Sequence, residues 1–249
     1  MKEIGPDPEP LTSESAQRQP VLSLVVTLYN EAENIEPMTR NLVAALQAQL
    51  DGIPFELVLV LNGSLDETPA RAAELAKEIS EIKLVSLEIN QGFGGGIQAG
   101  LAAASGELIG YTDADEQISA ADTVRVCSVA LEKQHDLVKA VRTTRTDGIN
   151  RLVVTTVYNA LFRLMYQVSN PDINGKPKIL KRNALKGMKL SCKDWFIDAE
   201  IMIQARKLNL SVAEVPISFS ARTRGKSNVR VSTIWEFLLN MWKYRNEHN

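Results

Sequence analysis

The sequence predicts an α/β fold in which a mainly parallel sheet is covered by helices. Between residues 21 and 141, short apolar runs rich in β-branched residues alternate with longer segments whose apolar residues recur at helical spacing. Repeated β–α units of this kind build a parallel sheet with helices on both faces. Ligands of such sheets bind beyond the carboxyl ends of the strands, so the loops that follow the strands are the first places to look for function.

The strands and helices of this first part follow one another in strict alternation. We expect strands at residues 21–28, 55–61, 82–87, 107–112 and 137–141. We expect helices at residues 33–50, 66–80, 94–104 and 119–133. In the first helix Leu42, Leu46 and Leu50 mark an apolar face. In the second, Asp66 suits the N-cap and Pro69 suits an early turn.

The part of the chain after residue 142 has a different character. Basic residues lead into an apolar stretch at 152–168, and a second apolar stretch covers residues 231–242. Both are expected to be helices with wide apolar faces. The first twenty residues are polar and Pro-rich and are expected to be disordered. The predicted organisation is therefore a tail at 1–20, one α/β domain at 21–228 and an amphipathic C-terminal helix at 229–249.

Composition excludes several classes of function. The net charge of −2 over 249 residues gives no general basic field, so nucleic acid is not an expected partner. Cys127 and Cys192 are far apart and match no metal or redox spacing, and there are only two histidines. A zinc site and a His-based catalytic triad are therefore not expected. No run approaches the roughly 18 apolar residues of a membrane-spanning helix, so any membrane attachment is expected to be peripheral.

The strongest local signal is a pair of carboxylates, Asp113 and Asp115, at the carboxyl end of a predicted buried strand. Gln117 adds another oxygen at the same edge. Oxygen ligands of this kind suit hard cations, and both Mg²⁺ and Mn²⁺ are candidates. A cation held there could stabilise a diphosphate as a leaving group. The plainer interpretation, that the two acids only cap the next helix, is weakened by their position after a strand.

Several motifs in order make the sequence resemble the family 2 glycosyltransferases, which have the GT-A fold. The resemblance is greatest to the dolichol-phosphate (polyprenyl-phosphate) mannose synthase group and covers residues 21 to about 230. The motifs that carry it are Val25–Asn34, Asn62–Thr68, Asn90–Gly94, Asp113–Gln117, Phe196–Glu200, Glu214–Ile217 and Arg222–Ser227. The resemblance implies a membrane-associated hexosyltransferase that transfers a sugar, with inversion and a metal ion, from a nucleotide-sugar donor to a polyprenyl phosphate.

The resemblance also implies roles for individual residues. Asp113, Asp115 and Gln117 would hold the metal, and Asp113, Asp115 and Arg222 would form the catalytic group. Donor-binding residues would be Tyr29, Asn30, Glu31, Asn62, Asp66, Asp113, Arg222, Lys226 and Ser227. Acceptor-binding residues would be Arg142, Arg151, Thr155 and Asp198. Arginine binds phosphate bidentately and stays charged, so cations before an apolar helix suit a phosphate on a lipid chain.

The expected chemistry is direct displacement at the anomeric carbon. A phosphate acceptor is already anionic and needs no general base, whereas a hydroxyl acceptor would need one. Asp198 or Glu200 could serve as that base, although support of the acceptor loops is the favoured interpretation of both. The donor can be GDP- or UDP-linked. The protein is expected in the cytoplasm, on the cytoplasmic face of a membrane, bound to the surface or to a membrane partner subunit.

Three alternatives stay open at the level of sequence. Leu61 and Asn62 stand where the family usually has Asp-Asp or Asp-Asn, so the chain could be an inactive nucleotide-binding scaffold. Lys178 also departs from the family pattern, which usually has an Arg there. A GT-A transferase could instead use a soluble saccharide as acceptor. Finally, Gly94–Ala99 fits G-x-G-x-x-A with Asp113 about twenty residues on, which would suit a dinucleotide-dependent oxidoreductase. The plainer interpretation of these glycines is close helix–sheet packing.

Overall fold

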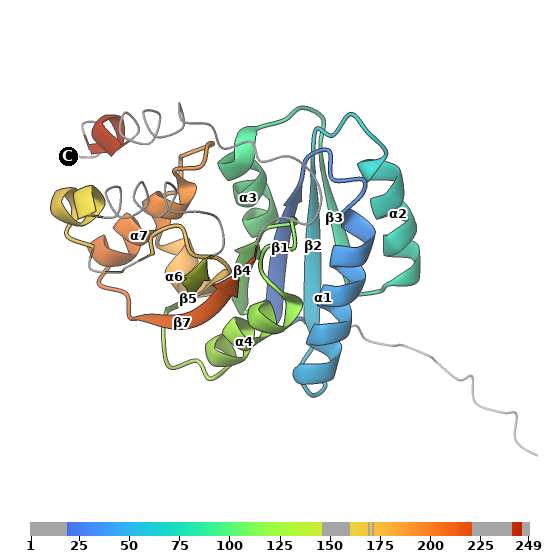
Figure 1. Ribbon diagram of the computed structural model, residues 1–249, viewed down its shortest axis with the longest axis horizontal. Coiled ribbons are helices and arrows are strands. Elements are labelled where there is room, and N and C mark those ends of the chain that lie inside the picture. Colours follow the sequence, from blue (N-terminus) through green and yellow to red (C-terminus); the bar gives the residue numbers. More distant parts are fainter. Residues whose placement is uncertain (1–18, 146–159, 169, 171, 221–240, 246–249) are drawn as a thin grey trace, which may run out of the picture.

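A sheet to which the described part of the chain contributes seven strands forms the centre of the molecule (Figure 1). The computed structural model describes residues 19–145, 160–168, 170, 172–220 and 241–245. The order of the strands across the sheet is β3-β2-β1-β4-β6-β5-β7, and β6 alone runs antiparallel to its neighbours. The strands are β1 (Leu22–Leu28), β2 (Phe55–Asn62), β3 (Ile82–Leu87), β4 (Leu108–Thr112), β5 (Leu137–Arg145), β6 (Lys178–Lys181) and β7 (Val212–Phe219).

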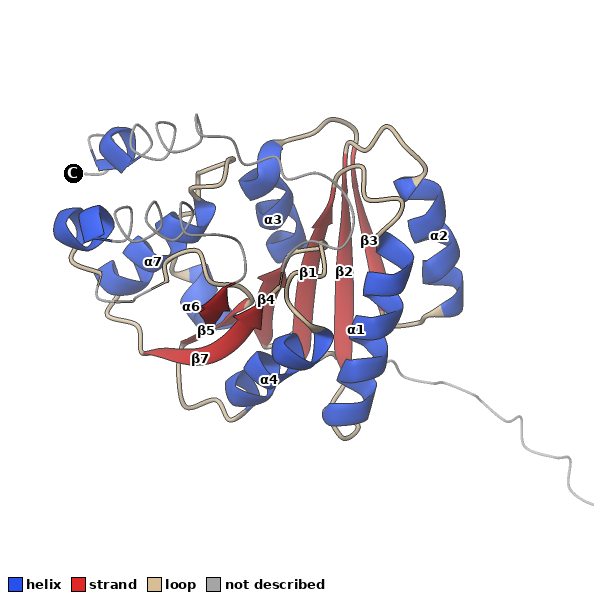
Figure 2. Ribbon diagram, in the orientation of Figure 1, coloured by secondary structure: helices blue, strands red, loops and turns tan. Residues whose placement is uncertain are grey.

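Helices cover both faces of this sheet, which gives three layers (Figure 2). They are α1 (Ile35–Gln49), α2 (Thr68–Glu78), α3 (Gly92–Ala103), α4 (Ala120–Leu131), α6 (Arg182–Lys186) and α7 (Ile197–Lys207). The core on one face contains α1, α2 and α4, and the core on the other contains α3 and α7. None of the helices in the described ranges is long and apolar enough to cross a membrane.

Alternation along the strands explains why both faces are buried. In β1, Leu24 and Val26 point into the core with α1, whereas Val25 points into the core with α3. Because successive side chains of a strand point to opposite faces, a strand that is apolar throughout needs cover on both sides. The apolar runs of β1, β2 and β4 therefore place these strands in the middle of the sheet, where their carboxyl ends meet at one edge.

The expected α/β architecture is confirmed, with small shifts at the ends of elements. All five expected strands and all four expected helices of the first part are present. Asp66 is not the N-cap of α2, because the helix begins at Thr68 and Glu67 takes that position. Four further elements, β6, α6, α7 and β7, were not predicted from the sequence. Of the two apolar helices expected later in the chain, residues 160–166 and 241–245 are described and helical. The rest of both lies outside the described residues, as does most of the tail at 1–20.

Candidate active site

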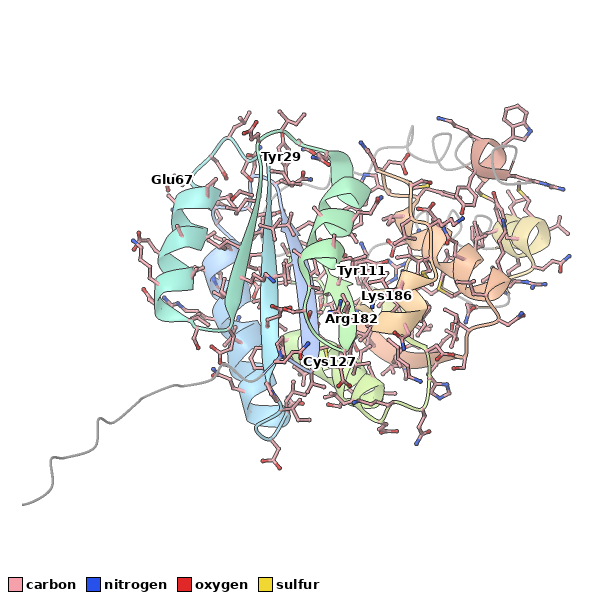
Figure 3. All side chains as sticks on the ribbon, turned by 180° about the vertical axis from the view of Figure 1, so that it is seen from behind. Tyr29, Glu67, Tyr111, Cys127, Arg182 and Lys186 are labelled. Carbon is pink, nitrogen blue, oxygen red and sulfur yellow. The ribbon has the colours of Figure 1, made fainter. Side chains whose placement is uncertain are left out.

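A cavity of about 730 Å³ opens at the carboxyl ends of β1, β2 and β4. Figure 3 shows Tyr29 at this edge, while Cys127 lies on α4 toward the other end of the strands. The position agrees with the general rule for ligand sites in parallel sheets. The lining residues are Thr27, Leu28, Tyr29, Asn30, Glu31, Ala32, Glu33, Asn34, Asn62, Asp66, Asn90, Gly92, Phe93, Asp113, Ala114, Asp115 and Trp195.

The loop after β1 is held against the loop after β2 by hydrogen bonds. Asn30 has a left-handed backbone (φ 56°), which Asn tolerates better than most residues. Its backbone N–H donates to Ser64 Oγ at 3.1 Å, and its own Oδ1 accepts from the N–H of Leu65 at 2.9 Å. The N–H of Glu31 donates to Thr68 Oγ1 at 2.9 Å. The expected donor residues Asn30 and Glu31 thus lie at the cavity on a loop that α2 fixes in place.

Asp66 holds these same two loops together. Its carboxylate accepts from the N–H and Oγ1 of Thr68, at 3.0 and 2.6 Å, and from the N–H of Ala32 at 3.2 Å. Burial raises the pKa of this carboxyl, but the hydrogen bonds outweigh burial and leave the pKa below its ordinary value. Asp66 therefore stays ionised and positions the wall of the cavity.

Asn62 fixes the third loop at this edge. Its Oδ1 accepts from the N–H of Gln91 at 2.9 Å, and its Nδ2 donates to the carbonyl of Gly92 at 3.0 Å. Leu61, its neighbour, packs in the hydrophobic core instead of facing the cavity. Where the family usually has two polar residues, this chain thus has Leu61 in the hydrophobic core and Asn62, whose side-chain amide holds the neighbouring loop.

The glycines of α3 serve close packing, as the plainer interpretation predicted. A Cβ at Gly94 would lie 2.3 Å from the carbonyl oxygen of Cys192, and one at Gly92 would lie 2.3 Å from that of Lys193. The N–H of Gly95 donates to Lys193 O at 3.2 Å. A backbone segment therefore occupies the N-terminal turn of α3, where a dinucleotide fold would place a pyrophosphate. The oxidoreductase alternative has no support in this geometry.

Asp113 and Asp115 follow β4 and both line the cavity. Asp115 is mostly buried, and its Oδ1 accepts from the N–H of Gln117 at 3.2 Å. The side-chain Nε2 of Gln117 donates to the carbonyl of Ser220 at 3.0 Å, which ties this edge to the end of β7. Gln117 is thus close to Asp115 but does not line the cavity, and its expected part in a metal site stays a prediction.

The chemistry of these ligands fits Mg²⁺ or Mn²⁺. Mg²⁺ is commonly held by one or two carboxylates together with water and substrate phosphates. Asp113 and Asp115 supply two carboxylates at a cavity wall. Within the described ranges no group of three His, Cys, Asp or Glu side chains is placed to hold a metal ion. Two carboxylates leave coordination positions that water and the phosphates of a substrate can fill.

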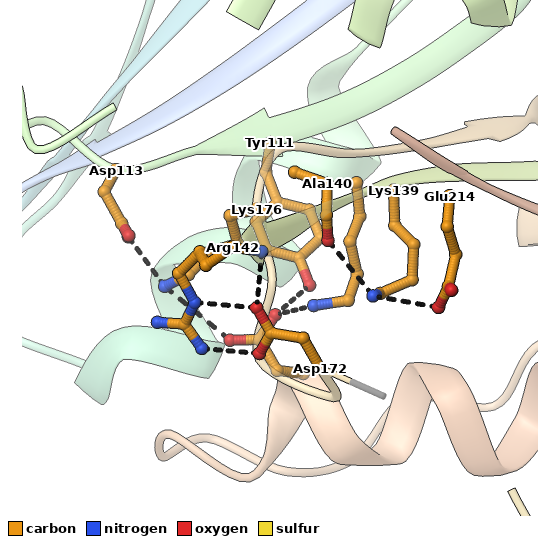
Figure 4. A network of polar contacts seen from close by, with 10 residues as sticks. Tyr111, Asp113, Lys139, Ala140, Arg142, Asp172, Lys176 and Glu214 are labelled. Atoms are coloured by element: carbon orange, nitrogen blue, oxygen red, sulfur yellow. Dashed lines mark hydrogen bonds and ion pairs between the residues drawn. The ribbon is translucent and has the colours of Figure 1, made fainter. Parts of the chain in front are cut away.

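A network of charged side chains lies behind Asp113 (Figure 4). Lys176 Nζ is 2.7 Å from Asp113 Oδ1 and 3.6 Å from Asp198 Oδ2. Asp198 also forms an ion pair with Lys178 and accepts from Tyr111 Oη at 2.6 Å. Asp198 is 2% exposed. The structure therefore buries Asp198 among three donors, and Asp198 is not among the residues that line the cavity, so its expected part in acceptor binding stays a prediction.

Arg142 is the only expected acceptor-binding arginine in the described part of the chain. Its Nε and Nη2 bind both oxygens of Asp172, at 2.7 and 2.6 Å. Burial lowers the pKa of Arg142, but Asp172 outweighs it, so the guanidinium stays charged. Burial raises the pKa of Asp172, but the hydrogen bonds and the charge of Arg142 together outweigh burial and bring this pKa down to about 2. The guanidinium is thus held in a fixed orientation, with its fork already used by a carboxylate.

Glu200, the other candidate base, is also fully engaged in structure. It is completely buried, and its carboxylate accepts from the N–H and Oγ of Ser191 and from the N–H of Cys192. These bonds hold the segment that leads to Trp195, which lines the cavity. The favoured interpretation of Asp198 and Glu200 as supporting residues agrees with this geometry.

Two features of the site were not predicted. Lys176 comes from a loop 63 residues beyond Asp113 in the sequence, and no local pattern indicates the contact. Phe93 and Trp195 stack with ring centroids 4.2 Å apart and line the same cavity. Five expected residues lie outside the described residues: Arg151, Thr155, Arg222, Lys226 and Ser227.

Comparison with known proteins gives consistent matches. The sequence model of Glycosyl transferase family 2 matches residues 23–189. The undecaprenyl-phosphate 4-deoxy-4-formamido-L-arabinose transferase of Sodalis glossinidius is 30% identical over 207 residues, covering 83% of this chain and 62% of that one. The dodecaprenyl-phosphate galacturonate synthase of Rhizobium johnstonii is 28% identical over 223 residues, covering 88% and 65%. The chain thus spans less than two thirds of these relatives.

Solved structures share the fold. The glucosyl-3-phosphoglycerate synthase of Mycobacterium tuberculosis, in complex with Mn²⁺, uridine diphosphate and glucosyl-3-phosphoglycerate, superposes with a TM-score of 0.69. It is 20% identical, and the match covers 93% of this chain and 82% of that one. At this identity the likeness establishes the architecture of the sheet and its helices, and nothing finer.

Proposed function

The chain belongs to glycosyl transferase family 2, and on that premise we propose that it transfers a sugar from a nucleotide-sugar donor to a polyprenyl phosphate. One observation carries the proposal. Asp113 and Asp115 lie together at the wall of a cavity whose other walls include the loops after β1 and β2. Carboxylates at the carboxyl end of a central strand are suited to a cation that binds a diphosphate.

The donor is proposed to be UDP- or GDP-linked. Tyr29, Asn30 and Glu31 would contact the nucleotide, with Asn62 and Asp66 holding the surrounding loops. Mg²⁺ or Mn²⁺ bound by Asp113 and Asp115, with Gln117 nearby, would stabilise the charge of the leaving diphosphate. The presence of Mn²⁺ and uridine diphosphate in the similar mycobacterial structure supports this assignment. Arg222, Lys226 and Ser227 are proposed to close over the donor phosphates.

An anionic acceptor agrees with the state of the two candidate bases. Asp198 is held by Lys178 and Tyr111, and Glu200 by Ser191 and Cys192, so neither is placed to take a proton from a hydroxyl. A phosphate needs no such base. The names of the Sodalis and Rhizobium relatives both specify a polyprenyl phosphate. Arg142, Arg151 and Thr155 are proposed to surround the acceptor phosphate, with Asp198 supporting them from behind.

The proposed reaction is a single displacement. An oxygen of the acceptor phosphate forms a bond to the anomeric carbon while the bond from that carbon to the nucleoside diphosphate breaks. Attack opposite to the leaving group inverts the anomeric configuration. The chain's own contribution is to hold the two phosphates in line and to exclude water from the cavity.

A polyprenyl acceptor places the protein at a membrane surface, proposed here to be its cytoplasmic face. The helical residues 160–166 and 241–245 contact each other, since Tyr166 Oη donates to the carbonyl of Met241. They expose Leu164 (80%) and Trp242 (65%) to solvent. Exposed apolar and aromatic side chains of this kind suit an interface with lipid or with a membrane partner subunit. The boundaries 21–228 for the catalytic domain and 229–249 for an amphipathic helix remain part of the proposal.

The test is product formation in detergent micelles. The protein is incubated with undecaprenyl phosphate, Mn²⁺ and one nucleotide sugar at a time, and lipid products are identified by mass spectrometry. A glycosyl phosphoryl lipid formed by the wild type and absent with Asp115→Ala, at an unchanged melting temperature, supports the proposal. Transfer to a soluble saccharide in place of the lipid would overturn the acceptor assignment. Nucleotide binding without any transfer would favour the inactive scaffold.

A further inference from the structure

Lys176 occupies an unusual place for a cation. It is 8% exposed, yet its ammonium directly contacts Asp113, one of the two carboxylates proposed to hold the metal. The same ammonium lies 4.3 Å from the centre of the Phe93 ring, which lines the cavity. The ammonium of Lys176 therefore lies at the wall of the cavity, next to the position proposed for the divalent metal ion.

The position of Lys176 is fixed by its own loop. Asp172 at the start of this loop is bound bidentately by Arg142, and a Cβ at Gly175 would meet the carbonyl oxygen of Ala140 at 2.0 Å. Lys178 at the end of the loop is the first residue of β6. Only a short, tightly packed segment carries Lys176, so the ammonium can adjust its side chain but cannot leave the neighbourhood of Asp113.

A divalent ion on Asp113 would be close to this ammonium. For an ion bound to Asp113 Oδ1, a metal–oxygen distance of about 2.1 Å added to the 2.7 Å between Oδ1 and Lys176 Nζ puts the two cations within about 5 Å of each other. Even at the dielectric constant of water, their repulsion at this distance weakens metal binding by about tenfold. Asp198, 3.6 Å away, gives the ammonium a second partner but does not remove it from the site.

A nucleoside diphosphate changes this balance because it brings negative charge to both cations. We propose, on the basis of the function proposed above, that Lys176 makes metal binding depend on the nucleotide. The empty cavity takes up free Mg²⁺ or Mn²⁺ poorly, because Lys176 already neutralises Asp113. With the diphosphate present, its negative charge attracts both the metal ion and the ammonium of Lys176, so the metal ion binds despite the ammonium beside it. Linkage then requires that the metal strengthens nucleotide binding by the same factor.

The experiment measures Mn²⁺ binding, by electron paramagnetic resonance of the free ion, with and without saturating UDP, and again with GDP. Lys176→Met removes the charge and keeps an apolar chain of similar length. Lys176→Arg keeps the charge. Lys193→Met is the matched control, because Lys193 is exposed on the segment next to Trp195 and contacts neither carboxylate through an ion pair in the described residues. Melting curves establish that each variant folds.

For the wild type we expect a coupling of at least about tenfold between the nucleotide and Mn²⁺. Lys176→Met should bind Mn²⁺ alone about tenfold more tightly than the wild type and show correspondingly weaker coupling. Lys176→Arg and Lys193→Met should keep the wild-type coupling. Equal affinity of the wild type and Lys176→Met for Mn²⁺ alone would overturn the inference while leaving the proposed function intact. Failure of the wild type to bind either nucleotide with Mn²⁺ would overturn the proposed function itself.

Discussion

Replacing Asp198 by Asn should destabilise the fold by leaving a buried ammonium without its counter-ion. Lys178 is completely buried, and Asp198 is its ion-pair partner in the described part of the chain. Asn is of similar size and can still accept from Tyr111 Oη, so the change removes mainly charge. Removing one member of a buried pair costs about 3–5 kcal/mol. A domain of this kind has only about 5–15 kcal/mol in total, so the loss should be large.

The pH dependence of this loss has a defined sign. Burial lowers the pKa of Lys178 to about 8, although Asp198 attracts the ammonium. Since the ordinary pKa is 10.5, the stability associated with this group is complete above pH 10.5 and is lost as the pH falls to about 8. In Asp198→Asn the carboxylate no longer attracts the ammonium, so the pKa of Lys178 falls further. The pH range over which the variant gains stability with rising pH therefore extends below pH 8. Its deficit relative to the wild type should therefore shrink as the pH rises toward 8, by at most about 1.4 kcal/mol per pH unit.

Urea denaturation followed by tryptophan fluorescence at several pH values between 6 and 9 measures both effects. The double variant Asp198→Asn/Lys178→Met completes a mutant cycle and should recover much of the loss, because an apolar side chain tolerates the buried position. As a control, Glu78→Gln breaks an exposed pair with Arg40 and should cost no more than about 1 kcal/mol. A loss below about 1 kcal/mol for Asp198→Asn, or a deficit that grows with pH, would refute the reasoning.

Three further expectations concern single positions. Asp115→Ala should abolish metal-dependent nucleotide binding with little change in melting temperature, and retained binding would contradict the metal assignment. Gly100→Ala should lower the free energy of unfolding, measured by urea denaturation, by about 1–3 kcal/mol, because the added Cβ would lie 2.2 Å from Val25 Cγ1. In the control Gly187→Ala the atom nearest to the added Cβ is 3.4 Å away, so the free energy of unfolding should stay within about 0.5 kcal/mol of the wild type. Arg151→Ala should raise KM for the polyprenyl phosphate by about 10–100-fold, and an equal rise for the donor would contradict its acceptor role.

The first half of the fold could be predicted because its information is local. The apolar run of β1 and the carboxylates after β4 each stand in one short segment, and parallel β–α units bring such segments to one edge. The elements from β6 to β7 were harder to predict. Helix α7 is buried from Ile197 to Ala205, so it lacks the amphipathic period by which helices are recognised. Strand β6 has only four residues, of which Lys178 and Lys181 are charged.

The polar partners at the site could not be predicted for a different reason. Asp66, Asn62 and Asp198 were expected from motif resemblance to contact substrates, and the structure adds that each also makes hydrogen bonds within the protein. A sequence motif marks a residue type and not the direction in which its side chain points. The contact between Lys176 and Asp113 depends on the packing of two distant segments, which only the assembled sheet defines. Strand β7, by contrast, could have been predicted from the sequence. Its apolar residues alternate with polar ones, and Val215, Ile217 and Phe219 are buried in the structure.

Binding of nucleotides and nucleotide sugars, measured by thermal shift with and without Mn²⁺, is the most direct test of a metal-dependent donor site at Asp113 and Asp115. A ligand present at a hundredfold excess over its Kd stabilises a fold by about 2.7 kcal/mol, which is readily observed as a rise in melting temperature. We predict a rise in melting temperature with one nucleoside diphosphate and its sugar, present with Mn²⁺ and lost in Asp115→Ala. A folded protein that shows no shift with any nucleotide, or the same shift with and without Mn²⁺, would contradict it.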